Sequence, residues 1–453
     1  MYLRHLHIRN LKLLKDFSLS FTNEDGKPRM WTVIIGENGT GKTSILQAIA
    51  MAAAGGLNVN GLVENVSSLP DKRDPKATVT LDVEFVLDAR QKQFRLYPGY
   101  PDKPQGDVVV RSLVELSPGR RNLVARSSYD PIPEVMHDID YGLDPIDEIR
   151  SMEDAKLWFV AAYGIHRFLP SDATWRPPLE HPSVDRLRPV FKPVNLIGTA
   201  FANILTSKKA TMYGNVLRAA LFNVENLLPR FEDLEMRGKG GVNSAQALQE
   251  RHRFIQNLPS GKLKLAANWL SHGYQSTIAW IADLVGHILY EAKAELPPQE
   301  MEGLVLIDEI DLYLHPSWQQ LLIQTLKQTF PRIQFVATTH SPLALVGLRP
   351  DQDEIVRLVI DETTGDVRQF DMKDGRPHEP DPRLMTGTEI YRSYFGINQF
   401  YPGRLGELLR DHRFLAANPG RSEEDEARLD EIEEELRNEG VEPDFPRTPR
   451  EAS

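Results

Sequence analysis

The stretch GENGTGKT at residues 36–43 combines the residue types that bind a nucleoside triphosphate. It matches the pattern GxxxxGK[ST], with the apolar run WTVII before it and a segment of good helix formers after it. Glycines let the backbone curl so that its N–H groups point at phosphate oxygens, and the start of the following helix adds a positive partial charge. The sequence therefore predicts an ATP- or GTP-binding loop made of Gly36, Glu37, Asn38, Gly39, Thr40, Gly41, Lys42, Thr43 and Ser44.

Four side chains in or after this loop have distinct expected roles. Lys42 is expected to reach the β- and γ-phosphates, and the Thr43 hydroxyl to bind Mg²⁺. In LVLIDEID, four apolar residues predict a buried strand that delivers Asp308 and Glu309 to its carboxyl end, where open α/β sheets bind ligands. Asp308 is expected to hold Mg²⁺, and Glu309 to polarise the attacking water. The alternative is that the two carboxylates only cap a following helix.

His340 closes another apolar run, FVATTHS, which predicts the next buried strand along the chain. A histidine at this point is placed to sense the γ-phosphate, and we expect it to contribute to catalysis. The alternative is a structural histidine at a strand end.

A second glycine-containing turn occurs in NWLSHGYQSTIAWIADL, residues 268–284, just before an amphipathic helix. A Ser-x-Gly turn at a helix N-terminus can bind an anion through its hydroxyl, its backbone N–H groups and the helix dipole. Because the loop at 36–43 already contacts the phosphates from its own side, a second turn is useful if it approaches the γ-phosphate from another subunit. Ser271 and Gly273 therefore predict a head-to-tail dimer, and an ordinary helix cap is the alternative.

The elements that position these residues predict an α/β fold in five parts. These are the N-terminal part of the core with the phosphate loop (1–75), a β-rich lobe and irregular connection (76–194), a helical insertion (195–260), the C-terminal part of the core (261–400) and an acidic helical tail (401–453). In the tail, Leu429, Ile432 and Leu436 form a thin apolar stripe on an acidic helix. This helix is either solvated or docks on a partner.

The composition leaves several classes of partner open. The net charge is −11, but residues 421–453 hold 13 acidic and 5 basic side chains, so the rest of the chain is close to neutral. Overall acidity therefore does not exclude a local groove that binds nucleic acid.

The sequence shows no signal for a membrane. No apolar run reaches the roughly 20 residues that span a bilayer, and no basic-then-apolar leader opens the chain. We therefore expect a cytoplasmic protein with no membrane as partner. The absence of cysteine excludes disulfides and thiolate metal sites.

Taken together, GENGTGKTS, LSHGYQS, LIDEIDLYLHP and ATTHSP resemble the ABC-type ATPase heads of the SMC-like and RecF-like group. FVAAYGIHR at 159–167 is similar to a tyrosine–glycine–arginine element common in that group. The nearest likeness is to stand-alone bacterial ATPases named AAA or ABC type, many of them the ATPase half of anti-phage systems such as Septu, PARIS and retron-linked operons. The motifs cover 1–50 and 268–345 strongly and the rest loosely. LSHGYQS departs from the transporter-type LSGGQ, and the glutamine that usually gives a Mg²⁺ ligand is not placed.

The resemblance implies an ABC-type ATPase head with a P-loop core sheet, an antiparallel β lobe and an inserted helical subdomain. It also implies a switch that binds and hydrolyses ATP with Mg²⁺ and pairs head-to-tail with a second copy. After His340 we find neither a cluster of acidic residues at strand ends nor a His–Asn–His pattern, so we expect a separately encoded nuclease or toxin as partner. The alternative is a RecF-like repair ATPase that binds DNA directly through Lys208, Lys209, Arg251, Arg253, Lys262 and Lys264.

Overall fold

The computed structural model divides the chain into two compact units, Met1–Gly387 and Thr388–Ser453. The division falls earlier than the boundary at 400 predicted from the sequence. The structure describes residues 1–87, 107–130, 144–151, 158–169, 182–194, 196, 207–222, 227–237, 250–292, 296–373, 380–397, 403–443 and 445–449.

A six-stranded sheet forms the centre of the first unit, in the order β14-β13-β3-β12-β11-β7. The strands are β3 (Trp31–Gly36), β7 (Val160–Tyr163), β11 (Gly303–Ile307), β12 (Ile333–Thr338), β13 (Glu354–Ile360) and β14 (Val367–Gln369). All neighbouring strands are parallel except β13 and β14, which form an antiparallel hairpin. Every residue of β7, β11 and β12 is buried, as expected for parallel strands covered on both faces.

A five-stranded antiparallel sheet lies on the other side of helix α1, in the order β2-β1-β4-β5-β6. Its strands are β1 (Tyr2–Leu11), β2 (Leu14–Ser20), β4 (Val79–Leu87), β5 (Val108–Leu116) and β6 (Val124–Asp130). Buried and more exposed residues alternate along β5, so one face packs inward. This sheet corresponds to the predicted antiparallel lobe, but it also takes in both strands from the first 20 residues.

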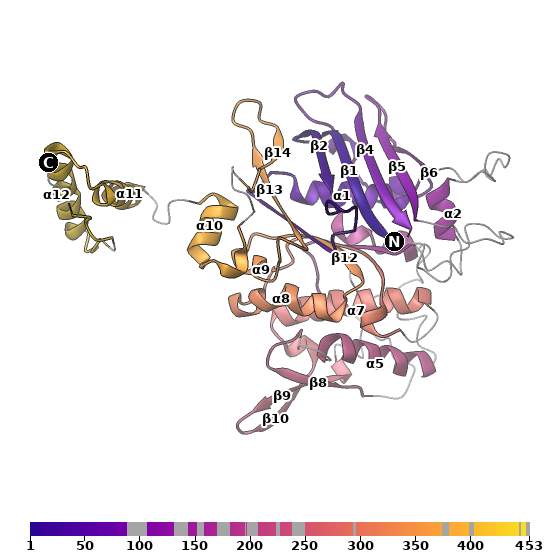
Figure 1. The fold of residues 1–453 in the computed structure, drawn as a ribbon. Helices are drawn as coiled ribbons and strands as arrows, with labels where there is room; N and C mark the ends of the chain where they lie inside the picture. The colour runs from indigo at the N-terminus through magenta and orange to yellow at the C-terminus, as the bar shows by residue number, and fades with distance from the viewer. Residues whose placement is uncertain are drawn as a thin grey trace. The chain divides into compact units, whose positions relative to one another are not determined.

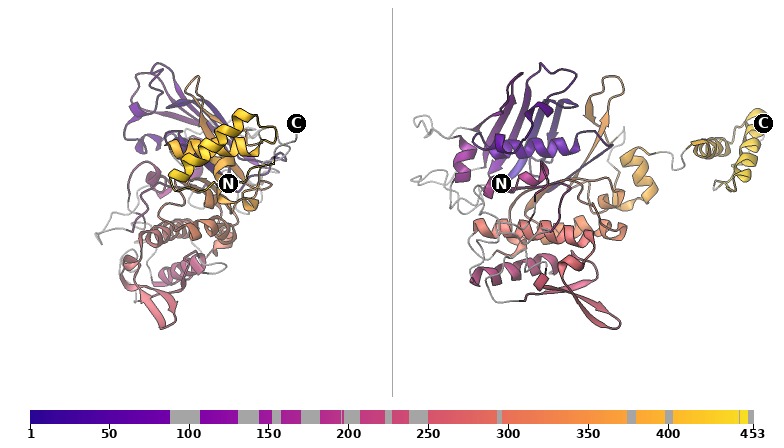
Figure 2. Two further views of the ribbon diagram at one scale, coloured as in Figure 1. Left: turned by 90° about the vertical axis from the view of Figure 1, so that its left-hand side faces the viewer. Right: turned by 180° about the vertical axis from the view of Figure 1, so that it is seen from behind.

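Helix α1 (Lys42–Ala54) lies between the two sheets (Figure 1), and the view from behind shows the same layering (Figure 2). Nine of its 13 residues are apolar, five of them alanine, and it is buried on almost every side, as expected of a helix that is apolar all round. One continuous core joins α1 to both sheets. Helices α7 (His272–Ala292) and α8 (Pro316–Thr329) lie on the opposite side of the central sheet (Figure 1).

The inserted segment differs from the prediction of a helical subdomain over 195–260. It contains α5 (Ser207–Phe222), which packs on α7, and also the strands β8 (Phe231–Glu235) and β9 (Arg253–Leu258). Together with β10 (Gly261–Leu265), which follows just beyond this segment, they form a three-stranded sheet. The ring of Phe231 packs edge-on against that of Tyr274, with 5.0 Å between the ring centroids. This tertiary contact, together with the turn at PSG between β9 and β10, outweighs the helix propensity of the segment.

The second unit contains α10 (Gly387–Phe395), α11 (Gly403–Ala417) and α12 (Glu423–Asn438). Leu429, Ile432 and Leu436 of the apolar stripe are buried, and the last two pack with Leu408 and Leu409 of α11. A partner within the same chain therefore covers the stripe, which was expected to be either solvated or docked on another protein.

The remaining elements are short. They are α2 (Pro145–Ser151), α3 (Pro182–Asp185), α9 (Pro342–Leu345) and the 3₁₀ turns Val59–Gly61, Val66–Ser68, Arg188–Val190, Ala267–Trp269, Pro298–Glu300 and Pro382–Leu384. The irregular connection predicted within 76–194 lies partly outside the described residues. In the described part of the chain, no helix is long and apolar enough to cross a membrane.

Candidate nucleotide-binding site

The phosphate loop connects β3 to α1 at the carboxyl edge of the central sheet. Gly39 and Gly41 have φ angles of 85° and 86°, in the left-handed region that favours glycine. A Cβ on Gly36 would lie 2.8 Å from the Leu358 carbonyl oxygen, so glycine is also needed there for close packing. The Thr40 hydroxyl donates to the Glu37 carbonyl at 2.9 Å and closes the curl of the loop.

Lys42, at the start of α1, points back into the loop. Its ammonium donates to the carbonyl oxygens of Gly36 and Glu37, each at 2.8 Å. Burial lowers the pKa of Lys42, while the nearby carboxylates of Asp308 and Glu309 oppose this shift. An ammonium held at a glycine-rich loop, at the start of a helix, suits the phosphates of a nucleotide.

Thr43 and Asp308 come together although 265 residues separate them. The Thr43 hydroxyl donates to one oxygen of the Asp308 carboxylate at 2.7 Å, and the Thr338 hydroxyl donates to the other at 2.6 Å. Asp308 is only 5% exposed. A hydroxyl beside a carboxylate offers the hard oxygen ligands that Mg²⁺ prefers when it also binds phosphates. Among the described residues, no group of three or more histidine, aspartate or glutamate side chains is arranged to hold a metal ion by itself.

Glu309 follows Asp308 where the chain leaves β11, and its backbone has a φ of 45°. Its N–H donates to the Thr338 hydroxyl at 2.8 Å, and its carbonyl accepts from the Arg167 guanidinium at 2.7 Å. The turn is therefore held from both sides. The sequence analysis assigned no role to Arg167. It is the last residue of FVAAYGIHR, and the likeness of this stretch to a known element was the signal that could have pointed to such a role.

His340 lies two residues after the end of β12, which lies between β3 and β11, so the structure brings it to the same edge of the sheet. Burial lowers the pKa of its imidazole, and the positive charge of Lys42 lowers it further. The carboxylates of Glu309, Asp311 and Asp308 oppose the shift.

The turn containing Ser271 is built differently. Ser271 and His272 are exposed at the start of α7, and no hydrogen bond of the described residues joins them to the phosphate loop. Gly273 is buried, and a Cβ on it would lie 2.5 Å from the Tyr313 carbonyl oxygen. Packing within the chain is therefore sufficient to require the glycine. Ser271, in contrast, faces outward.

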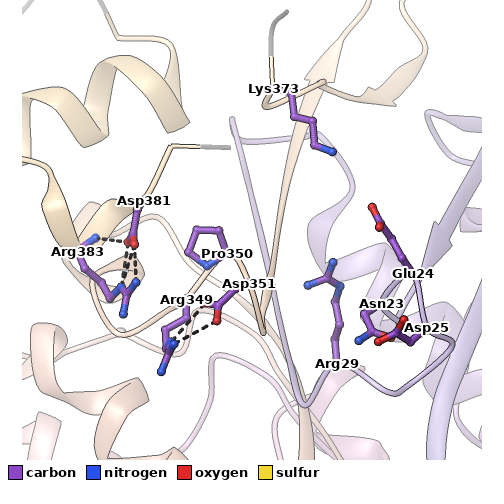
Figure 3. A pocket seen from close by; sticks show the side chains of 10 residues that line it. All are labelled: Asn23, Glu24, Asp25, Arg29, Arg349, Pro350, Asp351, Lys373, Asp381 and Arg383. Carbon is purple, nitrogen blue, oxygen red and sulfur yellow. Dashed lines mark hydrogen bonds and ion pairs between the residues drawn. The ribbon is translucent and has the colours of Figure 1, made fainter. Parts of the chain in front are cut away.

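A separate cavity of about 670 Å³ lies at the opposite edge of the central sheet (Figure 3). Arg29 and Arg349 line it shortly before β3 and β13 begin, whereas the phosphate loop follows the end of β3. Some of the charged side chains that line the cavity pair with one another, since Arg349 forms an ion pair with Asp351 at 3.1 Å. This cavity is no part of the candidate nucleotide site.

Two family models match the chain. The model described as "AAA domain, putative AbiEii toxin, Type IV TA system" matches residues 142–346, and the model "AAA ATPase domain" matches residues 1–124. These matches include the phosphate loop and the strand that carries Asp308. The chain is therefore similar to AAA-type ATPases over both parts of its central core. The resemblance predicted from the four motifs is thereby confirmed.

Two individual relatives are similar to the chain over different lengths. The chain is 26% identical over 446 residues to Septu protein PtuA of Bacillus mycoides (strain KBAB4), in a match that covers 96% of this chain and 50% of that protein. It is 46% identical over 139 residues to the Retron Ec83 probable ATPase of Escherichia coli, covering 30% of this chain and 23% of that protein. The chain thus spans about half the length of the PtuA relative.

Among solved structures, an SMC head bound to the C-winged helix domain of ScpA is similar to this chain. The two are 17% identical with a TM-score of 0.46, and the match covers 83% of this chain and 99% of that one.

Proposed function

We propose that this ATPase is a molecular switch that binds and slowly hydrolyses ATP with Mg²⁺ and closes head-to-tail with a second copy. The observation that carries the proposal is the contact of the Thr43 hydroxyl with Asp308 at 2.7 Å, beside the buried Lys42. Loop, cation and carboxylate meet at one point, as Mg²⁺-dependent phosphoryl transfer requires.

Each side chain has a defined task in this proposal. The N–H groups of the loop and the ammonium of Lys42 would bind the phosphates, while Thr43 and Asp308 would hold the Mg²⁺ ion. Mg²⁺, when bound, neutralises part of the phosphate charge. The Glu309 carboxylate orients a water molecule and accepts its proton. His340 contacts the γ-phosphate from the neighbouring strand end.

The second copy supplies Ser271. Its hydroxyl is exposed at the N-terminus of a 21-residue helix, where the helix dipole favours a negative charge. The phosphate loop of the same chain makes no hydrogen bond to it in the described residues. An outward-facing anion site of this kind is suited to the γ-phosphate held by another subunit.

Mixing two inactive variants tests this arrangement. Ser271→Arg should bind a fluorescent ATP analogue almost normally but lose hydrolysis, because the arginine obstructs closure and leaves the loop untouched. Lys42→Ala should lose binding. In a mixed head-to-tail dimer one site carries both defects, but the other combines an intact loop with an intact Ser271 turn. Some ATPase activity should therefore return on mixing.

Ser67→Arg, on an exposed turn, is the matched control for Ser271→Arg. It should hydrolyse ATP at the parental rate. Strong coupling between the two sites could hide recovered activity, so ATP-dependent association of the mixture is measured as well. Folded variants that show neither recovered turnover nor mixed association would rule out a role for Ser271 across the interface.

The cellular role that we propose is anti-phage defence, with a separately encoded nuclease or toxin as partner. The support is the similarity to proteins named Septu PtuA and Retron Ec83 probable ATPase. The test is to express the chain with the product of its neighbouring reading frame and to measure phage plating. Protection should need both proteins and should disappear with Lys42→Ala. Protection that persists with Lys42→Ala would contradict the switch.

A second candidate function is a RecF-like ATPase that binds DNA. The observation that favours it is the β9–β10 hairpin, on which Lys262 and Lys264 are exposed, although Lys264 already pairs with Glu235 at 2.7 Å. Arg253 begins the same hairpin, whereas the side chains of Lys208 and Lys209 lie outside the described residues. Replacing Lys262 and Lys264 with glutamate should then weaken DNA binding and reduce its salt dependence. Unchanged binding would remove this candidate.

A further inference from the structure

Arg167 is a fully charged side chain in the interior of the ATPase core. Only 1% of it is exposed. It follows β7, the edge strand beside β11, and its guanidinium donates to three backbone carbonyls. These are Gly164 at 2.8 Å, Glu309 at 2.7 Å and Asp308.

Two of those carbonyls belong to the residues that the proposed function places at the reaction. The register pairs Tyr163 of β7 with Ile307 of β11, and the Asp308 N–H donates to the Tyr163 carbonyl at 2.8 Å. Beyond Asp308 the backbone hydrogen bonds between β7 and β11 end, and the chain turns away from the sheet. Here the Arg167 guanidinium binds the carbonyls of Asp308 and Glu309 instead.

The turn needs such support because Glu309 has a φ of 45°. This left-handed conformation is unfavourable for a residue with a Cβ and persists only where the surroundings impose it. Thr338 holds the N–H of Glu309, and Arg167 holds its carbonyl. The planar fork of a guanidinium can bind two adjacent carbonyls at once, which a single ammonium does less well.

We propose that Arg167 is a positioning residue that fixes the direction of the Glu309 carboxylate by binding the carbonyls of Asp308 and Glu309. This inference rests on the proposed hydrolytic role of Glu309. It assigns no contact with the nucleotide to Arg167. The carboxylate of Asp308 is held separately by Thr43 and Thr338, so the role is specific to Glu309.

The first test is Arg167→Met, which keeps the length and the apolar stem of the side chain. The kcat for ATP hydrolysis should fall about 100-fold, the usual cost of a misplaced catalytic group. Affinity for a fluorescent ATP analogue and the Mg²⁺ concentration at half-maximal rate should stay the same, because the residues that bind nucleotide and metal are unchanged. Equal losses of affinity and kcat would indicate a general structural role and overturn the proposal.

A double variant shows whether Arg167 acts through Glu309. Arg167→Met should reduce the rate of the parental protein strongly but hardly change the residual rate of Glu309→Gln, because the group that it positions is already absent. A further loss of the same size in Glu309→Gln would overturn the proposal.

Arg167→Lys serves if the methionine variant does not fold. A lysine keeps the positive charge, but its single ammonium cannot bind two adjacent carbonyls as the planar guanidinium does. The kcat of Arg167→Lys should therefore fall while its affinity for the fluorescent ATP analogue stays the same. A parental kcat, or equal losses of kcat and affinity, would overturn the positioning role.

The controls separate this inference from the function on which it rests. Arg368→Met, at an exposed position of β14, should leave turnover unchanged. If the unaltered protein fails to hydrolyse ATP, the proposed function falls and the positioning role with it. If the unaltered protein turns over and Arg167→Met does so equally fast, only the positioning role falls.

Discussion

The phosphate loop and the turn at Ser271 are both glycine-containing connections that lead into a helix, but their polar side chains differ in their contacts with the rest of the chain. In the loop, Lys42 and Thr43 are bound to groups of the same chain, including Asp308 far away in the sequence. In the turn, Ser271 is exposed and only the glycine is packed. The loop and Asp308, both from one chain, form the part of the proposed site that binds phosphate and metal. The turn presents its polar group outward.

This difference separates two reasons for a glycine. Gly39 and Gly41 have left-handed backbones and create the curl that aims N–H groups at phosphate. Gly273 lies within a helix, where it lets the Tyr313 carbonyl approach. A glycine near a nucleotide motif is therefore no proof of a phosphate contact. In the turn the serine, not the glycine, remains the residue on which contact across a dimer depends.

The largest expected effect concerns the end of β11. Glu309→Gln keeps the shape of the side chain but loses the base, so hydrolysis should slow roughly 10²- to 10⁴-fold while ATP still binds. ATP-bound dimers should then accumulate and be visible by light scattering. Glu362→Gln, on the exposed β13–β14 turn, is the matched control. Hydrolysis at the parental rate would remove Glu309 from the mechanism, and a monomeric ATP-bound form would weaken the dimer.

Lys42→Ala should have the next largest effect. A charge-assisted contact contributes roughly 1.5–3 kcal/mol, so affinity for a fluorescent ATP analogue should fall about 10- to 100-fold. Lys72→Ala, at an exposed position, should bind as before. Unchanged affinity in Lys42→Ala would show that nucleotide binds elsewhere, and the contrast between loop and turn would lose its basis.

Gly273→Ala tests the packing reason for the second glycine. The added Cβ would lie 2.5 Å from a backbone oxygen that cannot move freely, so the free energy of unfolding should fall by about 1–3 kcal/mol. Gly61→Ala is the control, since a Cβ there meets nothing within 4 Å. Denaturant midpoints measure both. A normal midpoint combined with lost hydrolysis would indicate that Gly273 acts on nucleotide after all.

The smallest expected effect is a change in the titration of His340. Burial and the charge of Lys42 disfavour its cationic form, so NMR should find a pKa below the ordinary value without nucleotide. A γ-phosphate nearby adds negative charge and should raise the pKa again. Lys42→Ala should also raise it in the absence of nucleotide. A pKa that does not respond to a non-hydrolysable ATP analogue would place His340 away from the γ-phosphate.

Sequence reasoning worked where neighbouring residues carry the chemistry or the burial. The loop GENGTGKT lies between β3 and α1 as predicted, and the apolar runs before Asp308 and His340 are the buried strands β11 and β12. It was incomplete over 195–260, where strands β8 and β9 accompany helix α5 in a segment predicted to be helical. Short strands depend on partners that local periodicity does not show.

The sequence by itself determined which residues could bind phosphate and metal, because eight consecutive residues set the curl of the loop and apolar runs set the strands that deliver the carboxylates. Only the tertiary structure decided which of them meet. The parallel pairing of β3, β12 and β11 brings the end of each strand to one edge, so that Thr43 reaches Asp308. The burial of Arg167 against the turn of Glu309 likewise depends on elements distant in the chain, because a guanidinium can bind those carbonyls only after β7 has paired with β11.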